Sequence, residues 1–296
     1  MAVVMGPNQY GKAEVRMVAV DRGGPRHHLR DLTVSTTLRG DFTEAHRTGD
    51  NSAVLPTDTQ KNTVHAFAQQ QPVGEIEDFA LRLAHHFVES QPAVREAQVQ
   101  IEEHAWERVP VGGSGHDHAF HRAGDEKRTA AVTFDGAQAH VLSGLRDLVV
   151  LKTTGSEFRG FPRDAYTTLA ETDDRVLATA VTARWRHLQP RGDWAKNFAA
   201  VRADLLETFA TTHSRALQHT LHEMGRIVLD KHSGIAEVRM SLPNKHHFAV
   251  DMTPFGMANR NEVFFVSDRP YGIIEGTVTR DDVEAAPEAW YGLPEF

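Results

Sequence analysis

A helix followed by a strand occurs twice in this sequence, in the same order and with the same spacing. Apolar residues recur at intervals of three and four between residues 76 and 90, which predicts an amphipathic helix, and alternation over residues 97–102 predicts a strand. The same two patterns return at residues 217–228 and 238–242. An offset of about 139 positions brings the two copies into register. A duplicated unit is the simplest explanation, and it restricts the chain to folds made of two similar halves.

Strand-like segments also precede the helix in each half, so each half predicts strands, then helices, then strands. These segments cover residues 15–20 and 32–38 in the first half, and 141–152 and 176–185 in the second. Such an order is typical of an antiparallel sheet with helices on one face, an α+β fold. The two domains are predicted to span residues 1–138 and 139–296.

One more helix is predicted between the strands of each half. One covers residues 194–211, and a shorter one runs through Val64 and Phe67 with Thr57 or Thr59 as its cap. Glycines and charges interrupt any periodicity over residues 111–127, which predicts an irregular hairpin connection there.

Composition excludes several classes of function. The 296 residues are 40% hydrophobic and 24% charged, as in soluble globular proteins, and the net charge of −8 disfavours nucleic acid and anionic membranes as partners. With no cysteine, the chain has no disulfide and no thiolate nucleophile. Neither a P-loop nor a Gly-x-Gly-x-x-Gly motif is present, so nucleotide cofactors are not expected.

The predicted location is the cytoplasm. No apolar run is long enough to span a membrane, and the first residues lack the basic start of a secretory signal. The last four residues, Leu-Pro-Glu-Phe, differ from the peroxisomal Ser-Lys-Leu signal.

A compact histidine cluster is the one candidate metal site. His116, His118 and His121 lie close to Asp117 and Asp125 in the sequence. We favour a polar hairpin tip over a metal site because the glycine-rich stretch offers no rigid element to fix ligand geometry. No functional metal is expected, although adventitious binding stays open.

Two further segments have residue types suited to a flat, anionic ring. Phe158 and Arg175 combine an aromatic face with a guanidinium, and Asn244 and His246 fall on one face of a strand that Pro243 interrupts. The alternatives are a packed loop with surface arginines for the first pair and a β-bulge with solvated side chains for the second. By itself, Lys12 is typical of a solvated lysine, and Thr57 and Asp58 are typical of a helix start.

Taken together, short motifs along nearly the whole chain resemble those of the urate oxidase (uricase) family, in its bacterial form. The motifs are Tyr10-Gly11-Lys12, Asp50-Asn51-Ser52, Thr57-Asp58-Thr59, Lys61-Asn62-Thr63, Gly144-Leu145-Arg146-Asp147-Leu148, Leu151-Lys152-Thr153-Thr154, Glu157-Phe158-Arg159-Gly160-Phe161, Tyr166-Thr167-Thr168-Leu169, Asp174-Arg175, Gln218 and Ser241-Leu242-Pro243-Asn244-Lys245-His246. Each is short, and their occurrence in this order carries the resemblance.

The resemblance implies tandem tunnelling-fold (T-fold) domains, with helices outside an antiparallel barrel that closes only in a homotetramer. It implies active sites at subunit interfaces and oxidation of urate by O2 and water to 5-hydroxyisourate and hydrogen peroxide, without metal or organic cofactor.

It also implies a role for individual residues. Lys12, Thr57 and His246 would be the catalytic proton relay. The urate-binding residues would be Thr57, Asp58, Phe158, Leu169, Arg175, Leu217, Gln218, Asn244 and Ile274. Arg175 and Gln218 would grip the edge of the ring, and Thr57 and Asn244 would hold O2 or water above it. Two alternatives remain open: a T-fold hydrolase or aldolase acting on a pterin or purine ring, and a ring-binding oligomer without catalysis.

Overall fold

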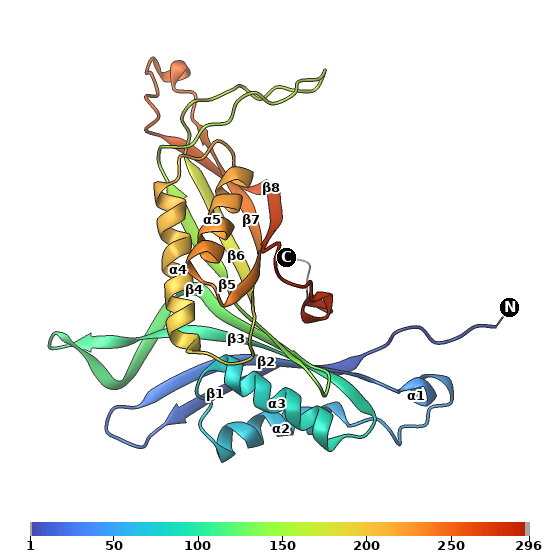
Figure 1. Ribbon diagram of the computed structural model, residues 1–296. Helices are drawn as coiled ribbons and strands as arrows, with labels where there is room; N and C mark the ends of the chain where they lie inside the picture. Colours follow the sequence, from blue (N-terminus) through green and yellow to red (C-terminus); the bar gives the residue numbers. More distant parts are fainter. Residues whose placement is uncertain (1, 294–296) are drawn as a thin grey trace. The chain divides into compact units, whose positions relative to one another are not determined.

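Eight β-strands are hydrogen-bonded in the order in which they occur in the chain (Figure 1). The computed structural model describes residues 2–293. The strands are β1 (Tyr10–Asp21), β2 (His28–Gly40), β3 (Val94–Val111), β4 (Ser114–Phe134), β5 (Ala139–Lys152), β6 (Leu177–His187), β7 (Ile235–Ala249) and β8 (Phe264–Thr279). The α-helices are α1 (Thr43–Arg47), α2 (Thr57–Gln70), α3 (Ile76–Ser90), α4 (Trp194–Thr211) and α5 (Leu217–Lys231), and the 3-10 helices are η1 (Thr253–Phe255) and η2 (Pro287–Trp290).

The predicted duplication of strands, helices and strands is confirmed. Helices α3 and α4 have the predicted bounds. The predicted cap of α2 is wrong, because Pro56 occupies the N-cap position without a side-chain hydrogen bond, and Thr57 is already the first helical residue. Pro56 has φ −53° and ψ 138°, an extended conformation from which the helix starts without a polar cap.

The irregular connection predicted for residues 111–127 is also wrong. Strands β3 and β4 continue as a long antiparallel hairpin, and the turn is the two-residue pair Gly112–Gly113 with φ values of 60° and 84°. A two-residue turn with positive φ at both positions matches the twist of the flanking strands and favours glycine. The distal hairpin has no apolar alternation because its side chains are exposed or only partly buried on both faces.

The chain divides into two units, each with its own core. One contains the chain up to Gly144, with Arg186–Ala195 and Glu284–Gly292, and the other contains Leu145–Trp185 and Lys196–Val283. The domain boundary predicted between residues 138 and 139 stays a prediction. Among residues 2–293, no helix is long and apolar enough to cross a membrane.

In the first unit, α3 packs on β3 and β4 through the apolar face that its sequence predicts. Phe79, Leu83 and Phe87 are fully buried, as is Val99 on β3. Burial of each such side chain contributes about 1.5–3 kcal/mol before the entropic cost of ordering it.

In the second unit, α5 packs on β7 and β8 (Figure 1). Leu221 and Met224 of α5 belong to the same buried cluster as Val238 and Met240 of β7. Gly225 allows a close approach to β8, since a Cβ atom there would lie 2.5 Å from Cγ2 of Val278. This packing fixes the first turn of α5, which carries two residues of the candidate site.

Hydrogen bonds link several buried polar side chains in the core of the first unit. The Ser143 hydroxyl donates to the fully buried Glu77 (Oγ–Oε1 2.6 Å), so it accepts a hydrogen bond from His187 (Nε2–Oγ 2.9 Å). Arg128 pairs with Glu77 at 2.7 Å. Burial lowers the pKa of His187 to about 4, which keeps its ring neutral.

This depressed pKa predicts a loss of stability in acid. The unfolded chain protonates His187 near pH 6.5 and the folded protein near 4, so the unfolded state binds more protons between these values. The free energy of unfolding should therefore fall by about 3 kcal/mol on this account as pH drops from 6.5 to 4. Urea unfolding of His187→Gln should show a correspondingly smaller decrease in the free energy of unfolding between pH 6.5 and 4. The exposed-site control His65→Gln should behave as the unmodified protein, and identical pH curves for all three proteins would contradict the assignment.

Candidate active site

A cavity of about 550 Å³ in the second unit brings together most of the predicted site residues. Its walls come from the segment between β5 and β6, the start of α5, and strands β7 and β8. The predicted residues that line it are Phe158, Leu169, Arg175, Leu217, Gln218, Asn244, His246 and Ile274. Its volume is in the range of ordinary small-molecule sites.

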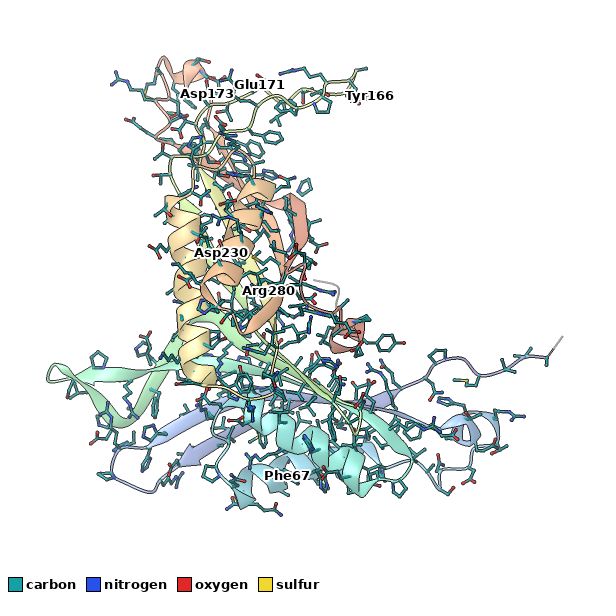
Figure 2. All side chains as sticks on the ribbon, viewed as in Figure 1. Phe67, Tyr166, Glu171, Asp173, Asp230 and Arg280 are labelled. Atoms are coloured by element: carbon teal, nitrogen blue, oxygen red, sulfur yellow. The ribbon has the colours of Figure 1, made fainter. Side chains whose placement is uncertain are left out.

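The segment between β5 and β6 is folded into a hairpin-like loop. Phe158 and Thr172 exchange backbone hydrogen bonds (N–O 2.9 and 3.2 Å). Glu171 and Asp173, labelled in Figure 2, bind the opposite arm: Glu171 accepts from the Gly160 N–H (3.0 Å), and Asp173 pairs with Arg159. These contacts hold Phe158 and Arg175 at the base of the loop, where they line the cavity.

Arg175 is a partly buried cation that has no acidic partner among the described side chains. Its Nε–H donates to the Ser156 hydroxyl (3.2 Å), its backbone N–H donates to the Ser156 carbonyl (2.9 Å), and its guanidinium lies 5.3 Å from the ring centre of Phe158. Among the side chains that the structure describes in residues 2–293, which do not include that of Asp268, no ion pair joins it to a carboxylate, and burial lowers its pKa. A cation that is desolvated and uncompensated favours an anionic ligand.

Phe158 offers this ligand an aromatic face. One of its faces is covered by Phe161, whose ring is stacked on it with centroids 4.9 Å apart and planes 15° apart. Arg163 in turn lies over Phe161 at 5.3 Å. Phe161 therefore restricts the orientation of Phe158 from behind.

The first turn of α5 supplies Leu217 and Gln218. Leu217 is 2% exposed and anchors the turn in the core of the second unit, whereas Gln218 is exposed toward the cavity that it lines. An amide that lines the same cavity as the guanidinium provides both a donor and an acceptor for a heterocyclic ring.

Strand β7 supplies Asn244 and His246. It runs without a break through Pro243, so the predicted interruption is wrong, but its register with β8 shifts between Asn244 and His246. The bulge alternative therefore applies, and both side chains line the cavity. Burial, and to a smaller extent the charge of Arg175, lower the pKa of His246 below its ordinary value of 6.5.

The other three predicted residues, Lys12, Thr57 and Asp58, lie in the first unit and do not line this cavity. Lys12 pairs with Thr36 just before a register shift in β1, and a Cβ at Gly11 would lie only 1.8 Å from the Thr36 carbonyl oxygen. Only glycine permits that approach.

Thr57 and Asp58 form the exposed start of α2, close to Lys12. The first hydrogen bond of this helix runs from the Gln60 N–H to the Pro56 carbonyl (3.1 Å), so the N–H groups before Gln60 have no partner in the helix. A hydrogen bond from Lys61 lowers the pKa of Asp58, and the charge of Lys12 adds to that lowering.

A buried hydrogen bond connects β2 to α2 behind these residues. The Thr36 hydroxyl donates to Oε1 of Gln60 (2.7 Å), and both side chains are at most 2% exposed. Because Lys12 pairs with Thr36, this bond fixes the strand that carries Lys12 relative to the helix that carries Thr57 and Asp58.

Sequence reasoning missed several residues that line the cavity. They are Ala170, Thr172, Asp174, Val176, His247, Phe248, Ala249, Asn261 and Phe264. The alternation of β7 beyond Pro243 was a usable signal for Phe248. No local pattern pointed to Asn261, which has a φ of 61° in the loop between β7 and β8.

The histidine cluster lies on a regular strand rather than in an irregular loop. His116, His118 and His121 belong to β4, and the rings of His116 and His118 lie edge to face at 4.4 Å. In the part of the chain that the structure describes, no group of three or more His, Asp or Glu side chains is arranged to hold a metal ion.

A second, larger cavity lies in the first unit. It has a volume of about 710 Å³ and is lined by β1, β2, α2 and the residues that follow α2. None of the predicted site residues lines it. The smaller cavity is the better candidate because it combines the unpaired Arg175 with an aromatic face and an amide.

Comparison with known proteins gives consistent matches over nearly the full length. The uricase family model matches residues 8–133 and 141–275. The uricase of Arthrobacter globiformis is 51% identical over 294 residues, covering 99% of this chain and 96% of that protein. The uricase of Dictyostelium discoideum is 38% identical over 276 residues, covering 92% and 96%.

Solved structures agree with these matches. The crystal structure of the Arthrobacter globiformis uricase superimposes with a TM-score of 0.94 and covers 98% of this chain and 99% of that one. A uricase from Bacillus fastidious, at 23% identity and a TM-score of 0.79, shares the fold over 92% of this chain and 93% of that one.

Proposed function

The chain belongs to the uricase family, and we propose that it oxidises urate in the cavity of the second unit. As a urate oxidase, it converts urate, O2 and water into 5-hydroxyisourate and hydrogen peroxide. The observation that carries the site assignment is Arg175, a partly buried guanidinium that pairs with none of the described carboxylates and shares one cavity with Phe158 and Gln218.

In this proposal the binding residues fix the ring by charge and shape. Arg175 and Gln218 hydrogen-bond the edge of urate, Phe158 stacks on its face, and Leu169, Leu217 and Ile274 bound the pocket. The charge of Arg175 offsets the negative charge of the substrate, and exclusion of bulk water strengthens that attraction.

The chemistry requires an electron-rich substrate. Triplet O2 cannot add to a closed-shell molecule in one spin-allowed step, so the substrate must first give up one electron. A urate dianion can do so. Forming the dianion requires a base, which is the role we assign to Lys12; a lysine acts as a base when its amine is neutral, a state that burial at an interface favours.

Protons then move along Lys12, Thr57 and His246. Thr57 can accept and donate through one hydroxyl, and His246 can take up a proton because its lowered pKa keeps the ring neutral. Asn244 and Thr57 hold O2, and later the attacking water, above the ring. Two electrons pass in turn from the urate dianion to O2, which takes up the two protons removed from urate and leaves as hydrogen peroxide, and water adds at the oxidised ring carbon.

The proposal assigns the complete site to an assembly of several chains. Lys12, Thr57 and Asp58 are absent from the cavity that holds the other site residues. We propose a homotetramer in which these three residues come from a neighbouring subunit, with Thr57 and the Asp58 N–H contacting urate. The unpaired N–H groups at the start of α2 support this role for Asp58. Location in the cytoplasm stays a prediction.

The lowered pKa of His246 predicts the acid side of the pH profile. Catalysis needs the neutral ring, so kcat should fall about tenfold per pH unit once pH drops below this pKa, which lies under 6.5. His246→Gln should lower kcat and remove this limb, and Arg175→Gln should shift it to higher pH because a nearby positive charge is lost. Steady-state rates between pH 4.5 and 8 test both expectations. If the fall of kcat at low pH is unchanged in His246→Gln, another group is responsible for it.

The reaction as written needs no metal, so prolonged dialysis against a chelator should leave kcat unchanged. The measurement combines loss of urate absorbance, O2 uptake and peroxide yield. One peroxide per urate, with O2 consumed, separates the oxidase from a ring hydrolase or aldolase, which consumes no O2, and from a binding protein, which turns over nothing. Activity lost to the chelator and restored by one metal would contradict the cofactor-free mechanism.

A further inference from the structure

We infer that Ser156, within a buried cluster of hydroxyl groups, is a positioning residue for urate binding; the inference rests on the proposed function of Arg175 and Gln218. The cluster consists of Ser156, Ser214 and Thr220, and each of the three is 0% exposed. None of them lines the cavity. They connect the two side chains that would grip the edge of the ring.

Ser156 holds Arg175 at two points. Its carbonyl accepts the Arg175 backbone N–H (2.9 Å), and its hydroxyl accepts the Nε–H (3.2 Å). The second bond fixes rotation about the end of the side chain and so sets the plane of the guanidinium. With Nε engaged, the terminal nitrogens remain as donors for a ligand.

Ser156 is joined to the segment that precedes α5. The Glu157 N–H donates to the Ser214 carbonyl (2.8 Å), and the Ser214 N–H donates to the Gly155 carbonyl (2.9 Å). These bonds form a short parallel bridge between Ser156 and Ser214. The backbone that orients Arg175 is therefore tied to the backbone that leads into the Gln218 turn.

Ser214 and Thr220 enclose that turn. The Ser214 hydroxyl donates to the Ala216 carbonyl (3.1 Å) and accepts from the Thr220 hydroxyl (2.8 Å). Leu217 and Gln218 lie between Ala216 and Thr220 in the sequence. The helix has no side-chain cap at Ala216, and these two hydroxyls tie its first turn to the Ser214 segment through the Ala216 carbonyl and the Thr220 side chain.

The cluster acts on binding rather than on the chemical step. Without the Ser156 oxygen, Nε loses its partner, and the guanidinium, which lies over the Phe158 ring at 5.3 Å from its centre, is free to rotate out of the plane that suits the ligand. Binding of urate then includes the free-energy cost of reorienting the arginine. An interaction of this kind is made equally with bound substrate and with the transition state, so its loss raises KM and spares kcat.

The decisive variant is Ser156→Ala, measured with urate as the probe. Under argon, where turnover stops, calorimetry should show the Kd for urate raised about tenfold, the effect expected for one hydrogen bond to a charged group. In air, KM should rise by about the same factor, with kcat within about twofold. Ser156→Cys, which keeps the volume but offers only a weak acceptor, should resemble Ser156→Ala.

Thr179→Val is the matched control. Thr179 is also 0% exposed in the second unit, but its hydroxyl has no hydrogen-bond partner among the residues that the structure describes. It should leave Kd and KM unchanged, and melting curves of all variants show whether any is misfolded.

Three results would overturn the inference: an unchanged Kd in Ser156→Ala, full affinity in Ser156→Cys, or a loss of kcat in proportion to a loss of stability. Arg175→Gln separates this failure from failure of the proposed function. If Arg175→Gln also binds urate normally, the assignment of the cavity as the urate site is wrong. If Arg175→Gln binds urate poorly while Ser156→Ala binds it normally, only the positioning role of Ser156 is wrong.

Discussion

Lys12→Ala is expected to lower kcat by about 10²-fold or more while the Kd for urate, measured under argon, stays nearly unchanged. The reason is that the proposed base contributes by moving a proton and not by holding the ring. Without it, the electron-rich dianion forms only at the rate at which solvent removes the proton. Stopped-flow measurement of urate consumption and anaerobic calorimetry together separate the two contributions.

Two further variants sharpen this expectation. Lys12→Arg keeps the positive charge but cannot act as a base near neutral pH, so it should be as inactive as Lys12→Ala. Lys61→Ala removes the lysine that pairs with Asp58 on α2 and should retain most of the activity. Normal turnover by Lys12→Arg would show that Lys12 contributes charge alone.

Arg175→Gln is expected to raise the Kd for urate by about 10²-fold, because it removes a guanidinium that lines the cavity and can make a forked, charge-assisted contact with the ring. Glutamine retains hydrogen-bonding groups, so the loss measures the charge and its geometry. Isothermal titration under argon gives the Kd, and kcat at saturating urate should be affected less than KM.

Arg163→Gln is the matched control for this change. Arg163 lies in the same loop, over Phe161, but it is exposed and does not line the cavity. It should bind urate normally. Equal losses in the two variants would mean that the loop as a whole, and not the guanidinium of Arg175, determines affinity.

The fold was largely predictable where burial is one-sided. Residues 76–90 place Phe79, Leu83 and Phe87 on one buried face, and this periodicity gives the bounds of α3. Prediction failed where burial is absent: the distal part of the β3–β4 hairpin has exposed or partly buried side chains on both faces, so no alternation marks it as a strand. Its glycine pair was visible, but without alternation it indicated a long irregular hairpin connection more than a two-residue turn.

The candidate site was predictable from family motifs and hardly at all from local chemistry. An arginine beside an aromatic residue is common on surfaces, and the feature that distinguishes Arg175 is the lack of a carboxylate partner, which depends on the fold. The sequence gives no indication of the role of Ser156. It is a small hydroxyl residue in a loop, and its role depends on a backbone bridge to Ser214, 58 positions away, which no periodic pattern in the sequence predicts.

The separation of Lys12 from Arg175 into different units has a genetic consequence. In the proposed tetramer, a chain defective in Lys12 still supplies an intact Arg175, and a chain defective in Arg175 still supplies an intact Lys12. Coexpression of the two inactive alleles should therefore restore activity, with about one site in four receiving both intact halves under random mixing. Two alleles that both affect Arg175 should never complement each other.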